Sequence, residues 1–277
     1  MIKALEQGAT HRAIIEWPEL TGTGQVDAIA EEVPVALIYN GISHAVMMAS
    51  PVNLAPFGLG FSLTEGIIDQ PEQVYGIEVS LDKSSAEVSL TIATRQFERL
   101  KQMRRTLTGR SGCGLCGKES LDQIRRVMTP VSGQFAVTHR AIQRATTDLA
   151  LHQPLQQQTG AVHGAAWCQL DGAIEAVCED VGRHNALDKL IGSLWSDGRL
   201  QGPGFLLMSS RASFEIVQKA AMAGISVVAT LSAPTSLAID LATSAGMTLI
   251  GFARESRHLA YSHPYRLTED HPEVSDD

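Results

Sequence analysis

The sequence predicts an α/β protein in which a smaller, β-rich part precedes a parallel sheet covered by helices. Two observations support this prediction. Before residue 108, short apolar runs are paired around turn residues, as in β-hairpins. After residue 160, apolar strands alternate with helices of about ten residues, which is the pattern of a parallel sheet with both faces covered. A glycine-rich segment lies between the two parts, so we expect three units: residues 1–108, 109–119 and 120–277.

The first part is predicted to consist of hairpins and two helices. Residues 1–25 show no regular pattern, and we expect them to be irregular. Asn40-Gly41 between the apolar runs 33–39 and 42–48 is a strong hairpin signal. A second hairpin is expected to join 77–81 to 86–92. One helix is expected to open at Ser50-Pro51 and run through 59–65, and the other to span the basic stretch 95–107.

In the second part, from residue 120 onward, strands are predicted to alternate with helices. Residues 121–128 predict a short helix and 138–152 a longer one, which Pro154 is expected to stop. Strands are then expected over 165–170, 174–177, 205–208, 226–231 and 248–252, and helices over 183–193, 213–223 and 236–244. The acidic tail after residue 267 is expected to fray.

Composition indicates a soluble globular protein. Hydrophobic residues make up 44% and charged residues 19% of 277 residues, which suffices for one or two domains. No apolar run reaches the roughly 18 to 20 residues that span a bilayer, and the N-terminus lacks the apolar core of a secretion signal. Four cysteines do not make a disulfide scaffold in a chain of this length. We therefore expect a reducing, cytoplasmic setting and no membrane partner.

The charge is unevenly distributed along the chain. A net charge of −8 disfavours binding to nucleic acid. From Arg95 to Arg126, however, there are nine Lys or Arg and only three acidic residues. Such a stretch is either the solvated face of an amphipathic helix or a landing site for an anionic ligand or an acidic partner. The sequence leaves both interpretations open.

Candidate ligand-binding residues follow the predicted strands, because open α/β sheets bind ligands at the carboxyl ends of their strands. Four loops qualify, at 179–185, 209–213, 232–236 and 252–257, and helix N-termini among them suit phosphate. Arginines and hydroxyls in these loops indicate a phosphorylated or nucleotide-like ligand: Arg183, Arg211, Arg254, Arg257, Ser209, Ser210, Ser213, Ser232, Thr235 and Ser236. The alternative for any single Ser or Thr is a helix cap.

The stretch EDVGRHNALDK raises a separate question. His184 stands at an expected helix start, where it is either an acid–base group or a structural hydrogen-bonding residue. Asp188 and Lys189 are expected to face solvent on that helix. Nearby, Cys168 and Cys178 stand ten residues apart on a predicted hairpin and are expected to be small buried hydrophobes.

The segment between the two parts reads GRSGCGLCGKE and contains Cys113 and Cys116. Flanking glycines leave the sulfurs uncovered, and the cations Arg110 and Lys118 favour the reactive thiolate. Zinc normally needs a second such pair, which is missing, so we expect no metal site. Disulfide exchange normally uses a pair that opens a helix after a strand. Persulfide carriage needs an exposed, mobile thiolate, and this segment suits it best.

Several blocks together resemble the FdhD family of formate dehydrogenase accessory sulfurtransferases. They include EEVPVALIYNGISHAVMMASP, GFSLTEGII, GRSGCGLCG, EDVGRHNALDKLIG, SSRASFEIVQKAAMAGI, SAPTSLAIDLA and GFARESR. The resemblance covers nearly the whole chain. It implies a cytoplasmic homodimer that takes persulfide sulfur from a cysteine desulfurase. The sulfur would pass to the molybdenum of bis-molybdopterin guanine dinucleotide, and formate dehydrogenase would receive that cofactor.

The resemblance also implies roles for individual residues. Cys113 matches the persulfide carrier and Cys116 the second position of the pair. The cofactor-binding segment matches Phe252, Ala253, Arg254, Glu255, Ser256 and Arg257. Phosphate-suited loops containing Arg183, His184, Ser209, Ser210 and Arg211 would take the guanine dinucleotide ends. The alternatives are a cofactor chaperone that transfers no sulfur and a thiol–disulfide oxidoreductase.

The second half of this family is similar to the cytidine-deaminase fold, so we expect a three-layer domain of that kind. Zinc deaminases need a Glu two residues after a metal-binding His or Cys, and then P-C-x-x-C. Here His184-Asn185-Ala186 and Ser209-Ser210-Arg211 take those places. Because the Glu and both metal cysteines are missing, the resemblance implies the scaffold without the deaminase reaction.

Overall fold

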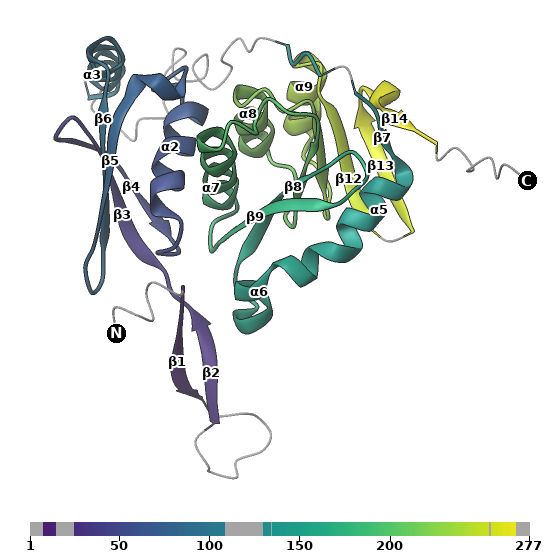
Figure 1. The fold of residues 1–277 in the computed structure, drawn as a ribbon, viewed down its shortest axis with the longest axis horizontal. Coiled ribbons are helices and arrows are strands. Elements are labelled where there is room, and N and C mark those ends of the chain that lie inside the picture. Colours follow the sequence, from purple (N-terminus) through teal and green to yellow (C-terminus); the bar gives the residue numbers. More distant parts are fainter. Residues whose placement is uncertain (1–7, 15–24, 109–129, 134, 255, 270–277) are drawn as a thin grey trace, which may run out of the picture.

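The computed structural model describes residues 8–14, 25–108, 130–133, 135–254 and 256–269 (Figure 1). A four-stranded sheet and a six-stranded sheet lie on opposite sides of a layer of helices (Figure 1). The mixed α/β class is therefore confirmed. The division at residues 108 and 119 and the likeness to the cytidine-deaminase fold stay predictions.

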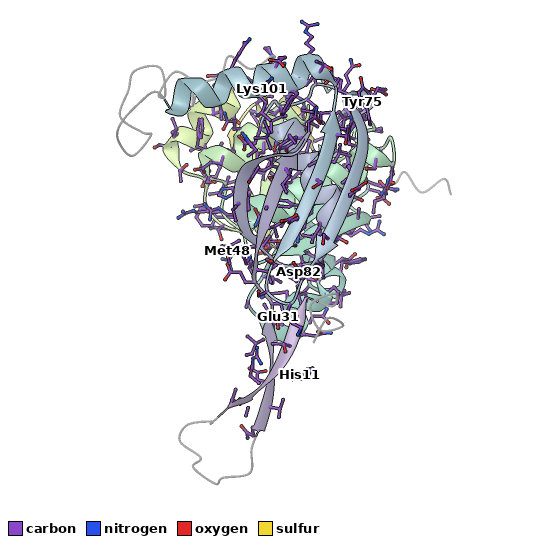
Figure 2. All side chains as sticks on the ribbon, turned by 90° about the vertical axis from the view of Figure 1, so that its left-hand side faces the viewer. His11, Glu31, Met48, Tyr75, Asp82 and Lys101 are labelled. Carbon is purple, nitrogen blue, oxygen red and sulfur yellow. The ribbon has the colours of Figure 1, made fainter. Side chains whose placement is uncertain are left out.

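The four-stranded sheet contains both predicted hairpins. Its strands are β3 (Val33–Tyr39), β4 (Ile42–Ala49), β5 (Val74–Leu81) and β6 (Ala86–Ile92), in the order β4-β3-β6-β5. Asn40 and Gly41 have φ values of 46° and 80°, in the left-handed region that Asn and Gly tolerate best. Alternate residues of β3 face the core, whereas Met48 and Tyr75 are exposed (Figure 2).

The N-terminal residues are more regular than expected. β1 (Ala9–Ile14) and β2 (Gln25–Ala30) form an antiparallel hairpin that extends away from the sheets (Figure 1). The expectation of irregular structure before residue 25 is wrong for residues 9–14. Most side chains of these strands are exposed, so no alternation of apolar residues marks them, and backbone pairing forms the ladder. At its base, Ala9 packs on Leu155 and Val162.

Two helices meet between the sheets at very short range. α2 (Leu54–Thr64) starts a few residues after the expected opening at Ser50-Pro51 and is buried along most of its length, and α7 (Arg183–Ser196) crosses it. A Cβ atom on Gly60 would overlap the carbonyl oxygen of Asp188, and one on Gly192 would overlap that of Pro56. The absence of a side chain at these two glycines therefore allows the backbones to touch. Trp195 packs against the hydrophobic cores on both sides of this contact.

The six-stranded sheet has the order β13-β12-β11-β10-β8-β9. Its strands are β8 (His163–Cys168), β9 (Ile174–Asp180), β10 (Phe205–Met208), β11 (Val227–Thr230), β12 (Thr248–Arg254) and β13 (Arg257–Ser262). β10, β11 and β12 are parallel, whereas β8 and β13 are antiparallel to their neighbours. The prediction of a parallel sheet is thus confirmed for the three central strands β10, β11 and β12. β13 was not predicted, because its residues RHLAYS are polar or exposed at the sheet edge and show no strand-like apolar pattern.

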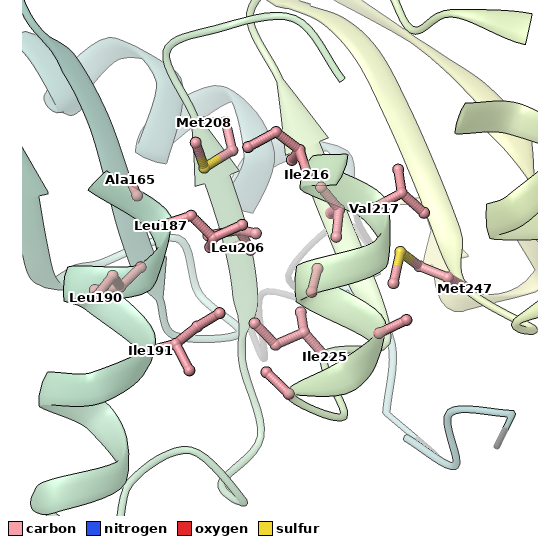
Figure 3. Close-up of a cluster of buried hydrophobic side chains, with 14 of the residues drawn as sticks. Ala165, Leu187, Leu190, Ile191, Leu206, Met208, Ile216, Val217, Ile225 and Met247 are labelled. Atoms are coloured by element: carbon pink, nitrogen blue, oxygen red, sulfur yellow. The ribbon is translucent and has the colours of Figure 1, made fainter. Parts of the chain in front are cut away.

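Helices cover both faces of this sheet, as predicted. α7, α8 (Phe214–Met222) and α9 (Ser236–Ser244) lie on one face, and α5 (His139–Asp148) lies on the other (Figure 1). Leu187 and Ile191 of α7 and Ile216 and Val217 of α8 pack on Leu206 of β10 in a dry cluster (Figure 3). No described helix is long and apolar enough to cross a membrane.

The remaining elements connect these layers. α3 (Thr94–Thr108) follows β6 as expected. The single helix predicted over 138–152 is divided into α5 and a 3-10 turn (Leu149–His152), and a further helix, α6 (Pro154–Thr159), follows. Pro154 begins a helix instead of ending one, because the first turn has no need of its missing N–H. Further 3-10 turns span Pro71–Gln73 and Pro264–Arg266, and β7 (Val137–Thr138) pairs with β14 (Leu267–Thr268). The helix predicted over 121–128 lies outside the described residues.

A buried ion pair joins the two halves of the fold. Lys189 Nζ lies 2.5 Å from Asp180 Oδ2 and 2.8 Å from the Ser50 carbonyl oxygen. Asp180 also accepts hydrogen bonds from the backbone N–H groups of Ser50, at 3.0 Å, and Gly182, at 2.7 Å. Asn185 Nδ2 reaches both Asp180 and the Met48 carbonyl oxygen. The expectation that Lys189 faces solvent is therefore wrong.

A second buried cluster is centred on Asp188, which precedes Lys189 in α7. Asp188 accepts hydrogen bonds from Thr64 Oγ1, at 2.7 Å, and from Lys219 Nζ, at 2.9 Å. Lys219 also reaches Glu65 Oε1, at 2.9 Å. Burial lowers the pKa of Lys219, but the carboxylates of Asp188 and Glu65 more than offset this, so the pKa is raised and the ammonium stays charged. Asp188 is buried and paired, which corrects the expectation of a solvated side chain.

The contact between α2 and α7 predicts that replacing Gly192 by alanine costs much more stability than replacing Gly76. Gly192→Ala should destabilise the protein by about 1 to 3 kcal/mol, because the new methyl group overlaps the Pro56 carbonyl and separates the helices. Gly76→Ala in β5 is the matched control, since an added Cβ there has no neighbour within 4 Å. Urea unfolding followed by circular dichroism measures both. Equal midpoints for the two variants would contradict the steric argument.

Lys189→Met should cost about 3 to 5 kcal/mol, because it leaves the Asp180 carboxylate buried without its cation. Lys101→Met removes the surface ion pair with Glu98 and should cost less than about 1 kcal/mol. Thermal or urea unfolding compares the two. A cost for Lys189→Met no larger than that of the control would show that the buried pair does not hold the halves together.

Candidate functional site

The four predicted loops meet at one edge of the six-stranded sheet. β9 runs in the same direction as β10, β11 and β12, because β8 is antiparallel to both β9 and β10. The carboxyl ends of all four strands therefore lie at one edge. Neighbouring loops are tied together there by hydrogen bonds from Thr235 N to the Ala212 carbonyl, at 3.0 Å, and from Phe252 N to the Ser232 carbonyl, at 3.3 Å.

Arg183 and His184 occupy the first turn of α7 at this edge. Arg183 is half-buried, and its Nε has no hydrogen-bond partner in the described part of the chain. His184 Nε2 lies 3.7 Å from Glu215 Oε2. Burial, and then the charge of Arg183, lower the pKa values of both His184 and His163. A guanidinium flanked by neutral imidazoles is a favourable place for an anionic group.

The serines after β10 hold the loop in place. Ser209 Oγ accepts a hydrogen bond from Gly164 N, at 2.8 Å, and Ser209 N donates to the Gly164 carbonyl, at 2.9 Å. Ser210 is buried and donates to the Arg211 carbonyl, at 3.0 Å. Arg211 itself is exposed. The structure therefore gives the two serines a positioning role and leaves the Arg211 guanidinium available to a ligand.

The segment from Phe252 to Arg257 turns between β12 and β13. Phe252 has a φ of 51°, and an irregularity in the pairing follows it. Ala253 is fully buried against the α5 side of the sheet, so only its backbone can face a ligand. Arg254 and Arg257 are exposed and paired across the turn, and Ser256 is exposed between them. Glu255 lies outside the described residues.

Thr235, Ser236 and Ser213 lie at helix starts, as the capping interpretation predicts. Thr235 is the N-cap of α9, and its hydroxyl accepts a hydrogen bond from Ala238 N at 3.3 Å. Ser213 is the N-cap residue of α8 and Ser236 the first residue of α9. The cap at Thr235 is confirmed, so its hydroxyl is engaged within the fold. The arginines are the stronger candidates for contact with a ligand.

A cavity of about 490 Å³ opens beside Ser209 and His163. It lies between the amino end of β8, the loops after β10 and β11, and the α6 region, which contributes Gln153 and Gln156. Neither Gln153 nor His163 was predicted to line a site. Gln153 stands in an ordinary polar run before a proline, and no spacing rule links it to Ser209 or Leu231, which lie far along the chain.

The described cysteines behave as predicted. Cys168 and Cys178 are buried and free, and burial raises the pKa of both thiols, that of Cys178 to about 11. Cys113 and Cys116 lie outside the described residues. After that segment the described chain resumes at the opposite edge of the sheet, where Val131 N donates to the Ala245 carbonyl at 2.9 Å. No group of three potential metal ligands occurs among the described residues.

Stability should fall as the pH drops below the ordinary histidine pKa of about 6.5. Burial lowers the pKa values of His163, His184 and His258, so the native state binds fewer protons than the unfolded state in that range. His258 Nδ1 lies 3.1 Å from His139 Nδ1, where a second charge would be repelled. His258→Gln should therefore flatten the fall in melting temperature between about pH 7.5 and about pH 5.5. His11→Gln, on the exposed hairpin, is the control and should show the same fall in melting temperature as wild type. If His258→Gln also showed the wild-type fall, the contribution assigned to His258 would be contradicted.

Comparisons with known proteins agree on one family. A model of the FdhD/NarQ family matches residues 30–268. The sulfur carrier protein FdhD of Cupriavidus necator is 52% identical over 244 residues, covering 88% of this chain and 85% of the relative. That of Acinetobacter baylyi is 52% identical over 237 residues, covering 85% and 86%.

A solved structure shows the same fold. A formate dehydrogenase accessory protein from Desulfotalea psychrophila superimposes with a TM-score of 0.72 at 24% identity, covering 94% of this chain and 99% of that chain. This likeness supports the fold alone. The family match over most of the chain and the relatives at about half identity show that this chain belongs to the FdhD/NarQ family.

Proposed function

We propose that this chain is a sulfurtransferase that carries persulfide sulfur from a cysteine desulfurase to the molybdenum of bis-molybdopterin guanine dinucleotide, the cofactor of formate dehydrogenase. The placement of its four cysteines carries the proposal. Cys168 and Cys178 are buried with raised pKa values, so they are not thiolates at neutral pH. Cys113 and Cys116 are the other two, and they stand among glycines and cations.

The carboxyl edge supports the acceptor half of the proposal. Arg183, Arg211, Arg254 and Arg257 lie in loops at this edge, and three of them are exposed. A guanidinium group can donate two parallel hydrogen bonds to the oxygens of one phosphate, which suits the pyrophosphate of a dinucleotide. The proposed cofactor contains two dinucleotides, each with its own pyrophosphate. We propose that a cytoplasmic homodimer presents two copies of this edge, one to each dinucleotide.

The loading step follows from thiol–persulfide exchange. The Cys113 thiolate attacks the outer sulfur of the desulfurase persulfide. A new bond forms between that sulfur and Cys113, the old S–S bond breaks, and the desulfurase cysteine leaves as a thiolate. No net electrons are exchanged with the surroundings.

Release gives Cys116 a role. Its thiolate attacks the inner sulfur of the Cys113 persulfide, forms a disulfide with Cys113 and expels hydrosulfide. Cys116 thereby supplies the two electrons that reduce the sulfane sulfur. The hydrosulfide replaces an oxygen ligand of molybdenum, which leaves as hydroxide. A dithiol reductant then restores both thiols for the next cycle.

Incubation of the purified chain with a cysteine desulfurase and cysteine should add about 32 Da, one sulfur atom, to Cys113. Cys113→Ala should abolish the adduct and the activation of formate dehydrogenase. Cys178→Ala is the matched control, because its buried thiol should neither carry sulfur nor matter for activation. Intact-protein and peptide mass spectrometry measure the adduct, and formate oxidation measures activation.

Two other outcomes would favour the rival functions. Full activation by Cys113→Ala would overturn sulfur transfer and favour a cofactor chaperone. Turnover of a disulfide substrate without any adduct would favour a thiol–disulfide oxidoreductase. Folding is monitored by circular dichroism, and nucleotide binding by calorimetry. Cys113→Ala should leave both unchanged because the carboxyl-edge loops contain no residue of the cysteine segment.

A further inference from the structure

The four-stranded sheet is covered by a helix on one face only. α2 packs on its inner face, whereas no described helix covers its outer face, and α3 crosses only one end of the sheet (Figure 1, Figure 2). The six-stranded sheet, by contrast, has helices on both faces. A sheet in a layered α/β protein is normally covered wherever its face is apolar. The side chains of the outer face therefore decide whether it is suited to water.

β3 has the sequence of a strand that is buried on both faces. It reads VPVALIY and lies between β4 and β6, with parallel pairing to β6. A strand with one face in water normally alternates apolar and polar residues, whereas a continuous apolar run marks a strand that is covered on both faces. The inward residues of β3 are buried, but Pro34, Ala36 and Ile38 face outward and are only half-buried. The strand therefore lacks the outer cover that its sequence suits.

The apolar surface continues from β3 onto β4. Met48 lies opposite Pro34 and Val46 opposite Ala36, so both side chains share the outer face of the sheet. Val46 is 61% and Met48 50% exposed, and Met48 is labelled on this face in Figure 2. We call the five side chains of Pro34, Ala36, Ile38, Val46 and Met48 the outer stripe. Contiguous exposed apolar side chains of this kind mark sites of protein–protein interaction.

Beside the outer stripe, the same face is acidic. The strands β3, β4, β5 and β6 contain no lysine or arginine, and their two carboxylates, Glu78 and Glu87, are exposed. Glu87 lies opposite Ala36, and Glu78 lies opposite Ser89, which is itself opposite Ile38. Both carboxylates are therefore on the outer face. An apolar stripe bordered by carboxylates complements a partner surface that is apolar at its centre and basic at its margin.

We propose that the outer face binds a basic amphipathic helix of a partner protein, with the apolar side of that helix on the outer stripe and its lysine or arginine side chains directed at Glu87 and Glu78. A helix there would complete the layering of helix, sheet and helix that the six-stranded sheet already has. A second copy of this chain is a poorer occupant, because contact between two such faces would bring like charges together. The inference goes beyond the proposed function and needs no sulfur chemistry.

The test uses the full-length chain and a fluorescent helical peptide that repeats Leu-Lys-Lys-Leu-Leu-Lys-Leu, so that its leucines line one face. Fluorescence anisotropy measures binding. Wild type should bind this peptide at least about tenfold more tightly than a peptide with Glu in place of every Lys, because the carboxylates of the outer face repel the acidic peptide. A permuted peptide of the same composition has no apolar face to cover the outer stripe, so it should also bind at least about tenfold more weakly.

Two matched pairs of variants locate the binding on the outer face. Val46→Lys places a charge within the outer stripe and should weaken binding of the basic peptide by about tenfold or more. Leu151→Lys adds the same charge at a leucine that is 75% exposed in the other half of the protein, and it should bind like wild type. Glu87→Gln should weaken binding by about threefold and reduce its dependence on salt. Asp240→Asn removes the same charge from the exposed side of α9 and should do neither.

Three results would overturn the inference. One is a wild-type chain that fails to bind the basic peptide or binds all three peptides equally. Another is wild-type affinity in the Val46→Lys and Glu87→Gln variants, with folding checked by circular dichroism. The third is a lower sedimentation coefficient of Val46→Lys than of wild type, which would assign the outer face to a contact between two copies. Because no sulfur donor is present, each result is independent of the adduct on Cys113, and absence of that adduct would leave the peptide result standing.

Discussion

The fold depends on one buried carboxylate, that of Asp180. Its Oδ2 accepts hydrogen bonds from Lys189 Nζ and Ser50 N, and its Oδ1 accepts from Gly182 N and Asn185 Nδ2. These partners come from the loop after β4, the end of β9 and the first turns of α7. A buried charge is tolerated only when such a set of partners is complete. One side chain therefore fixes the junction of both sheets at the same place where α7 begins.

This junction also determines how the carboxyl edge is built. Arg183 and His184 follow Asp180 after two intervening residues, so the ion pair that stabilises the core also fixes the first turn of α7, which would face a ligand. The direct contact of Gly60 and Gly192 with backbone of the opposite helix prevents α7 from shifting independently of α2. A ligand at this edge meets loops that are already in position, which reduces the entropic cost of binding.

Local patterns predicted much of the fold, whereas contacts between distant residues could not be predicted. Asn40-Gly41 identified its hairpin because the turn conformation requires those residues. The carboxyl-edge loops and the buried Cys168 were found because strand periodicity extends over several residues. Lys189 was placed in solvent because its partner Ser50 lies 139 residues away.

The burial of Cys168 and Cys178 bears on where transferred sulfur could be lost in the proposed reaction. A persulfide exchanges with any thiolate within reach, so each additional reactive cysteine would be a sink from which sulfur returns only slowly. Holding two thiols protonated inside the core removes those sinks without removing the residues. The same burial shields them from oxidation to sulfinic acid, which could not be reversed by exchange. Under the proposed function, burial of these two thiols would keep the transferred sulfur on Cys113.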